Sequence, residues 1–131
     1  MRKKTWISGF ALCLAVSAGS AQAAITEDSF LVRNTGDLVE LCSAAPSDAM
    51  YTAASNFCHG FAVGVFRVLQ EQDMARKVNH LFCLPNPAPT RNEALASFVR
   101  WAKADAARTT QSPADGIAMF LSQQYPCPRG R

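Results

Sequence analysis

The chain has 131 residues, of which 49% are hydrophobic and 18% are charged, and its formal net charge is +3. This length suits a single domain. Three basic residues fall within the first four positions, and the remaining chain carries ten basic and ten acidic residues. It therefore has neither the basic excess of a nucleic-acid-binding domain nor a net charge that would steer it toward a charged polymer.

Residues 1–23 have the pattern of a secretory signal peptide. Arg2-Lys3-Lys4 forms the basic start, and a largely apolar run over 6–18 follows. Ala21-Gln22-Ala23 matches an A-x-A cleavage site. The apolar run is shorter than the roughly 20 residues of a spanning helix. We therefore expect an exported mature domain over 24–131 that has no membrane association after cleavage.

Four cysteines remain after cleavage: Cys42, Cys58, Cys83 and Cys127. An even number of cysteines in a small exported chain predicts two disulfides, because the destination is oxidising. Four cysteines allow three pairings, and their positions in the sequence do not choose among them.

The first segment, residues 24–33, lacks clear periodicity and is predicted to be a loosely ordered lead-in. A first helix should begin at Asn34 or Thr35, which can cap it, with Asp37 favourably placed in its first turn. Residues 43–46, Ser-Ala-Ala-Pro, should end it.

A long second helix should run from Ser47 or Asp48 to about Gln72. Helical spacing relates its apolar residues, which are Met50, Ala54, Phe57, Cys58, Phe61, Val65, Val68 and Leu69. Gly60 and Gly64 each cost a helix about 1 kcal/mol relative to alanine. We expect another backbone to approach them closely, either from a helix of the same domain or from a second subunit. The ends of the helix are too polar for a membrane dimer motif.

The second half of the chain predicts a stiff connector followed by two helices. Prolines alternate over 85–89, which excludes a helix interior there. The residues 90–93, Thr-Arg-Asn-Glu, match a capping box that opens a third helix. The residues 106–111 are predicted to be a link, and Ser112-Pro113 should begin a fourth helix that stops at 125–128. The predicted fold class is all-α, a small four-helix domain stapled by disulfides.

No residue pattern predicts catalysis or a cofactor. The only histidines, His59 and His80, are not part of a C-x-x-C or H-x-x-x-H motif, so we expect no metal site. Cys58 and His59 are adjacent on a helix and point about 100° apart, which does not suit a nucleophile–base pair. A small cell-envelope enzyme is thus the least favoured hypothesis. Trp101 is interpreted as core, with an interface anchor as the alternative.

Two loops are candidates for a protruding contact surface. These are the connector at 85–89 and the loop at 43–47. A stiff segment loses little conformational entropy on binding, which favours a loop that plugs a cleft. The alternative is that both are plain connections.

Four motifs together resemble a known family. They are Leu41-Cys42, then Phe57-Cys58-x-Gly60-Phe61-x-x-Gly64-Val65, then Phe82-Cys83-Leu84-Pro85, and finally Tyr125-Pro126-Cys127-Pro128. This pattern resembles the Tai/Rap family of immunity proteins found with type VI secretion systems. The resemblance implies a periplasmic, disulfide-bonded and usually dimeric protein that binds a secreted peptidoglycan amidase and blocks its active site. Phe61 stands where the family commonly has Tyr, and Arg67 lies near a frequent Asp.

The portion from Cys58 to Cys83 is also similar to the periplasmic acid-stress chaperone (HdeA-like) family. By that analogy, Cys58 would pair with Cys83 and Cys42 with Cys127. The same resemblance supplies the alternative function, a periplasmic stress chaperone that binds unfolded clients.

Overall fold

The computed structural model describes residues 23–128, which contain helices and loops but no strand. A short 3-10 helix, η1 (Glu27–Leu31), is followed by α1 (Thr35–Cys42), α2 (Tyr51–Met74), α3 (Arg91–Lys103), α4 (Ala106–Thr109) and α5 (Pro113–Gln124). The predicted all-α, disulfide-linked domain is confirmed. The predicted signal peptide lies outside the described residues, apart from its last position.

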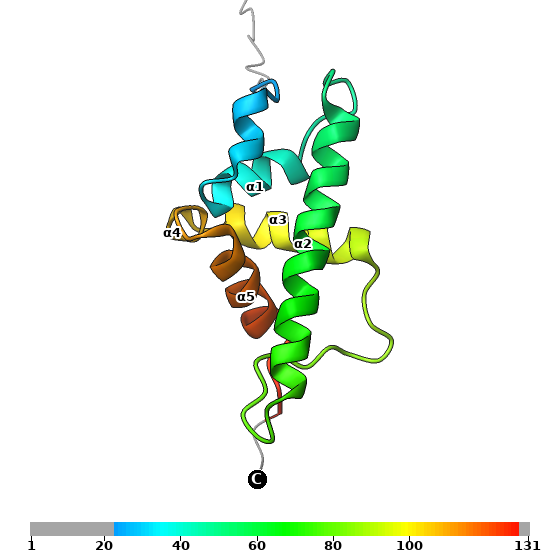
Figure 1. Ribbon diagram of the computed structural model, residues 1–131, viewed down its shortest axis with the longest axis vertical. Helices are drawn as coiled ribbons and strands as arrows, with labels where there is room; N and C mark the ends of the chain where they lie inside the picture. The colour runs from blue at the N-terminus through cyan, green and yellow to red at the C-terminus, as the bar shows by residue number, and fades with distance from the viewer. Residues whose placement is uncertain (1–22, 129–131) are drawn as a thin grey trace, which may run out of the picture.

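Helix α2 runs along the long axis of the molecule, and α1, α3 and α5 pack against it, whereas α4 contacts α1 and α3 (Figure 1). η1 and α1 lie beside its amino-terminal half, α3 crosses behind it, and α5 lies beside its carboxyl-terminal half. The buried core therefore forms where α1, α3 and α5 meet α2. Its residues include Leu38, Leu41, Ala54, Phe98, Ala102, Ile117, Phe120 and Leu121.

Helix α1 begins as its sequence predicts. The Asn34 side chain accepts a hydrogen bond from the Asp37 N–H at 2.9 Å, which satisfies one of the free donors of the first turn. Leu38 and Leu41 are 0% and 1% exposed. The helix thus has a fully buried face, which fixes it against α2 and α3.

Helix α2 begins at Tyr51, three or four residues after the predicted start at Ser47 or Asp48. The Asp48 carboxylate instead closes a turn, because it accepts the N–H groups of Ile25 and Met50, each at 2.8 Å. These two backbone donors hold the pKa of Asp48 below its ordinary value. Asp48 therefore attaches the start of the domain to the amino end of α2.

The amino-terminal segment is ordered, so the prediction of a loose lead-in over 24–33 was wrong. Residues 27–31 form η1, and Ile25 and Val32 are each only 9% exposed. Phe30 also packs edge-on against Phe57 of α2, with ring centroids 5.6 Å apart. These contacts with distant residues order a segment whose own sequence has no periodicity.

The two predicted caps of the second half are confirmed. The Thr90 hydroxyl accepts the Glu93 N–H at 3.3 Å, and the Glu93 carboxylate accepts the Thr90 N–H at 2.8 Å, which completes the capping box of α3. Ser112 caps α5 through the Asp115 N–H at 3.2 Å, and Pro113 occupies the first helical position.

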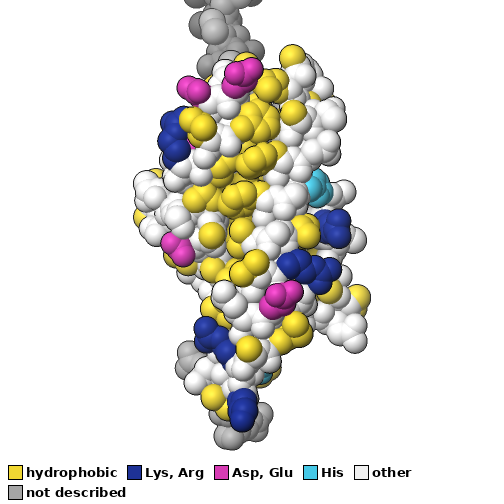
Figure 2. Space-filling view, in the orientation of Figure 1, with side chains coloured by type: hydrophobic (Ala, Val, Ile, Leu, Met, Phe, Trp, Pro, Cys, Tyr) yellow, Lys and Arg dark blue, Asp and Glu magenta, His cyan; other side chains and the backbone are white. Residues whose placement is uncertain are grey.

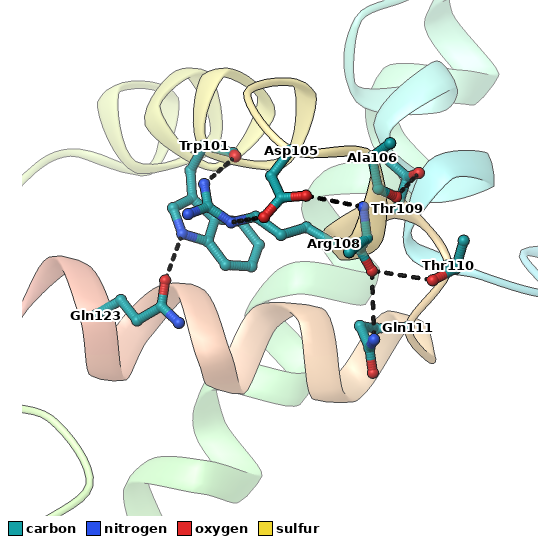
Figure 3. A network of polar contacts seen from close by, with 9 residues as sticks. Trp101, Asp105, Ala106, Arg108, Thr109, Thr110, Gln111 and Gln123 are labelled. Carbon is teal, nitrogen blue, oxygen red and sulfur yellow. Dashed lines mark hydrogen bonds and ion pairs between the residues drawn. The ribbon is translucent and has the colours of Figure 1, made fainter.

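The predicted link at 106–111 instead contains the one-turn helix α4. Asp105 caps it by accepting the Ala107 N–H at 2.9 Å. Arg108 then turns back over α3, where it donates to the Trp101 carbonyl at 2.6 Å and lies 4.6 Å from the Trp101 ring (Figure 3). Trp101 also donates to Gln123 of α5 at 2.9 Å. These contacts favour the core interpretation of Trp101.

The disulfides pair differently from the prediction made by analogy. Cys42 is bonded to Cys58, and Cys83 is bonded to Cys127. The predicted Cys58–Cys83 and Cys42–Cys127 pairs were therefore wrong. Cys58 lies in the amino-terminal half of α2, whereas Cys83 follows the carboxyl end of α2 and donates its N–H to the Tyr125 carbonyl at 2.8 Å.

The prediction that a backbone packs closely on Gly60 and Gly64 from within the domain was also wrong. Both glycines are exposed, and a methyl group added to either would meet no atom within 4 Å. The alternative that a second subunit covers them remains a prediction.

Asp73 stabilises the turn that follows α2 and gives a pH prediction. The Leu81 N–H donates to its carboxylate, and the His80 Nδ1 lies 3.0 Å from the other oxygen. The Leu81 hydrogen bond, followed by the weaker effect of His80, holds the pKa of Asp73 below its ordinary value. A lowered folded-state pKa stabilises the fold above the unfolded value of about 3.9, and this stabilisation is lost as pH falls through the folded value.

We therefore expect Asp73→Asn to lower the melting temperature at pH 7. Below about pH 4, the melting temperature of this variant should fall less steeply with decreasing pH than that of the unmodified protein. Circular dichroism melts between pH 7 and pH 2 would measure this. The exposed Glu40 of α1 provides a control, because Glu40→Gln should leave the pH profile unchanged. A parallel shift of the whole Asp73→Asn curve, with no change of slope, would contradict the prediction.

Candidate binding surface

The connector between Cys83 and α3 projects from the body of the molecule (Figure 1). Its residues 85–88 are exposed. Cys83 holds one end through its disulfide to Cys127 and through its N–H, which donates to the Tyr125 carbonyl at 2.8 Å. Thr90 holds the other end through the capping box of α3. The connector is thus a stiff exposed loop that is anchored at both ends.

The loop 43–47 and the connector lie beside different halves of α2. The loop lies at the amino end of α2, whereas the connector lies beside the carboxyl-terminal half (Figure 1). The connector also borders an apolar pocket to which no residue of the loop contributes. We therefore take the connector as the candidate site.

An apolar pocket of about 160 Å³ lies beside the connector, between α2, α3 and α5. Leu84 and Pro89, near the two ends of the connector, form part of its wall. The helices supply the other lining residues, which are mostly small or aromatic: Ala62, Val63, Phe66, Ala94, Leu95, Phe98, Ile117, Phe120 and Leu121, together with Tyr125. These residues give the pocket a largely apolar wall.

Two arginines, Arg67 and Arg91, also line this pocket. Both are exposed, and within residues 23–128 neither forms an ion pair with a carboxylate. Arg67 donates to the Gln70 side chain at 2.9 Å. Figure 2 shows basic side chains next to hydrophobic ones, with an acidic side chain beside them, on the side of α2 from which the connector projects. The pocket thus has an apolar interior beside two arginines that form no ion pair within residues 23–128.

The carboxylate of Glu93, which lies near Tyr125 of this pocket, is already hydrogen-bonded within α3 and its cap. Glu93 accepts from the Thr90 N–H and hydroxyl, which holds the pKa of Glu93 below its ordinary value. Burial raises the pKa of the Tyr125 hydroxyl, and the charge of Glu93 adds to this effect. Tyr125 is therefore neutral near pH 7 and offers a hydroxyl beside the pocket.

A second hollow, of about 420 Å³, adjoins the Cys42–Cys58 disulfide and includes His59 and Asn92 in its wall. It does not include His80, which lies after α2 and pairs with Asp73 in the last turn of that helix. Within residues 23–128, no group of three or more histidine, cysteine or acidic side chains is placed to hold a metal ion.

The residues of the four cysteine motifs lie in different parts of the structure. Phe61 stacks on Phe57 with ring centroids 6.0 Å apart, away from the connector. Pro85 lies in the connector, and Pro126 is exposed next to the disulfide that anchors it. Nothing in the local sequence of Arg91 indicates that it lines the same pocket as Arg67.

The described part of the chain has the features of a binding protein: a stiff exposed loop, a preformed apolar pocket, and cysteines paired in disulfides. The family model of Rap1a immunity proteins matches residues 34–127. The chain therefore belongs to this family of immunity proteins, whose members act against a secreted effector. No significant match was found among curated proteins or among solved structures. No helix within residues 23–128 is long and apolar enough to span a membrane.

Proposed function

We propose that the mature protein is a periplasmic immunity protein that binds a peptidoglycan amidase delivered by a type VI secretion system and blocks its active site. The family match over residues 34–127 carries this proposal. The amidase and the secretion system come from the resemblance of the four cysteine motifs to the Tai/Rap family.

The anchored connector supports a mechanism of occlusion. Association loses about 0.5–1.5 kcal/mol for each flexible side chain that it immobilises, and more for a loop that must become ordered. A connector with three prolines and two fixed ends avoids most of that cost. It can therefore enter a cleft with little loss of conformational entropy.

The proposed role requires no chemistry from the protein itself. All four cysteines of the described chain are paired, so none offers a thiolate nucleophile. The same disulfides suit an oxidising compartment, and the signal-peptide pattern at 1–23 supplies the route to it.

The test is inhibition of a secreted cysteine–histidine amidase, and a gene for such an amidase next to this one would identify the enzyme to use. We expect one equivalent of mature protein to abolish hydrolysis of peptidoglycan fragments, measured by chromatography of the products. Ala88→Arg places a long charged side chain on the exposed connector and should weaken inhibition at least tenfold, or about 1.4 kcal/mol.

Ala104→Arg is the matched control, because Ala104 is equally exposed but lies at the carboxyl end of α3. It should inhibit like the unmodified protein. Equal inhibition by both variants would contradict occlusion by the connector. A protein that leaves the amidase active but suppresses client aggregation at pH 3 would contradict the proposal and support the acid-stress chaperone alternative.

A further inference from the structure

We infer that the pocket beside the connector receives one apolar side chain of the effector, and that a carboxylate next to that side chain binds Arg67 and Arg91. The inference rests on the proposed function for the identity of the partner. It adds where the partner is held and by what chemistry.

The size of the pocket suits a single ring or branched aliphatic group. An apolar protein cavity of about 150 Å³ is large enough to bind benzene, and this pocket measures about 160 Å³. Its wall includes Phe66, Phe98 and Phe120, which offer the faces and edges that aromatic side chains prefer.

The two arginines favour a negatively charged group on the partner, next to the apolar side chain that enters the pocket. A guanidinium presents several donors in a plane that matches a carboxylate. Arg67 and Arg91 come from different helices, line the same pocket, and have no carboxylate partner in residues 23–128. Glu93 is held by Thr90. Glu71, one turn after Arg67 on α2, forms no ion pair with it. An acidic group on the partner is therefore the complementary charge.

The pocket is continuous with the connector, so one partner can contact both. Leu84 and Pro89 belong to the pocket wall, and the exposed residues 85–88 lie between them in the chain. The Cys83–Cys127 disulfide fixes the end of the connector next to Leu84. A partner whose cleft accepts the connector would thus have its surface against the pocket.

The first experiment tests the pocket without an effector. The full mature protein is titrated with N-acetyl-phenylalanine and with N-acetyl-phenylalanine amide, and backbone amide shifts are followed by NMR. Both probes should shift the amides of Val63 and Ala94, with dissociation constants on the order of millimolar. The carboxylate should bind at least fivefold more tightly than the amide. Equal affinities, or shifts confined to other residues, would overturn the inference.

Variants separate the two parts of the site. The double change Arg67→Gln and Arg91→Gln should remove the advantage of the carboxylate and leave binding of the amide unchanged. Ala94→Leu should fill the pocket and abolish binding of both probes. Arg100→Gln is the matched control on α3, because Arg100 is exposed and lies outside the pocket wall. It should have no effect, and loss of probe binding in this variant would contradict the assignment.

The second experiment places the same variants in the amidase assay. Ala94→Leu and the double arginine variant should each weaken inhibition at least tenfold, while Arg100→Gln should not. If Ala94→Leu fails to fold, the double variant still decides, because both arginines are exposed. Full inhibition by variants that no longer bind the probes would overturn the inference and leave the proposed function standing. Probe binding by an unmodified protein that inhibits no amidase would instead contradict the proposed function.

Discussion

Replacing both Cys83 and Cys127 with alanine should lower the free energy of unfolding by about 4 kcal/mol, the largest loss expected from removing one covalent link. The bond joins residues that are 44 positions apart. In the chain-entropy description, a loop of that length restricts the unfolded chain by about 4 kcal/mol. That is a large share of the stability of a domain of this size.

The Cys42–Cys58 bond is the internal comparison, because it closes only 16 positions and should contribute about 3 kcal/mol. Urea unfolding of both double-alanine variants would measure the two values. The two bonds should also differ in function. Loss of Cys83–Cys127 frees one end of the connector and should weaken binding of the effector, whereas loss of Cys42–Cys58 leaves both ends fixed.

Peptide mapping of the non-reduced protein provides the direct check on the pairing. A fragment that links Cys42 to Cys58 is expected. A fragment that links Cys58 to Cys83 would restore the pairing predicted by analogy. It would also remove the reason to expect that the two double-alanine variants differ in binding of the effector.

Alanine should have opposite effects at the glycines of α2 and α5. Gly116 lies against Thr35, and a methyl group added there would come within 2.2 Å of the Thr35 hydroxyl oxygen. Thr35 is fully buried, and its hydroxyl donates to the carbonyls of Gln111 and Ser112, at 3.2 and 3.1 Å. It therefore cannot move aside without breaking contacts between α1 and α5.

We expect Gly116→Ala to destabilise the protein by about 2 kcal/mol, since overpacking costs about 1–3 kcal/mol and exceeds the gain in helix propensity. Gly60→Ala and Gly64→Ala should each stabilise it by up to about 1 kcal/mol, because the added methyl groups meet open space in a helix. Thermal unfolding at neutral pH would measure all three.

A Gly116→Ala protein as stable as the unmodified one would contradict the close contact between α1 and α5. Destabilisation by Gly60→Ala or Gly64→Ala at low protein concentration would contradict the exposure of these two glycines. A loss of stability that appears only at high protein concentration would instead indicate that a second subunit covers them.

Local signals predicted most of the helices because their chemistry is confined to a few neighbouring residues. Asn34, Thr90 and Ser112 cap helices with donors three residues ahead, so a short stretch of sequence contains both partners. The alternating prolines likewise exclude a helix at the connector. The helix α4 was missed because a single turn has no periodicity, and its order depends on Arg108 and its contacts with Trp101.

The sequence by itself determined the helical class, the main helix boundaries, and the stiffness of the connector, because capping and proline geometry act locally. Only the tertiary structure decided the cysteine pairing, the close packing at Gly116, and the placement of Arg67 and Arg91 in the wall of one apolar pocket. These features depend on how α2 crosses α1, α3 and α5. That crossing is set by the packing of side chains that are far apart in the chain, which no local pattern records.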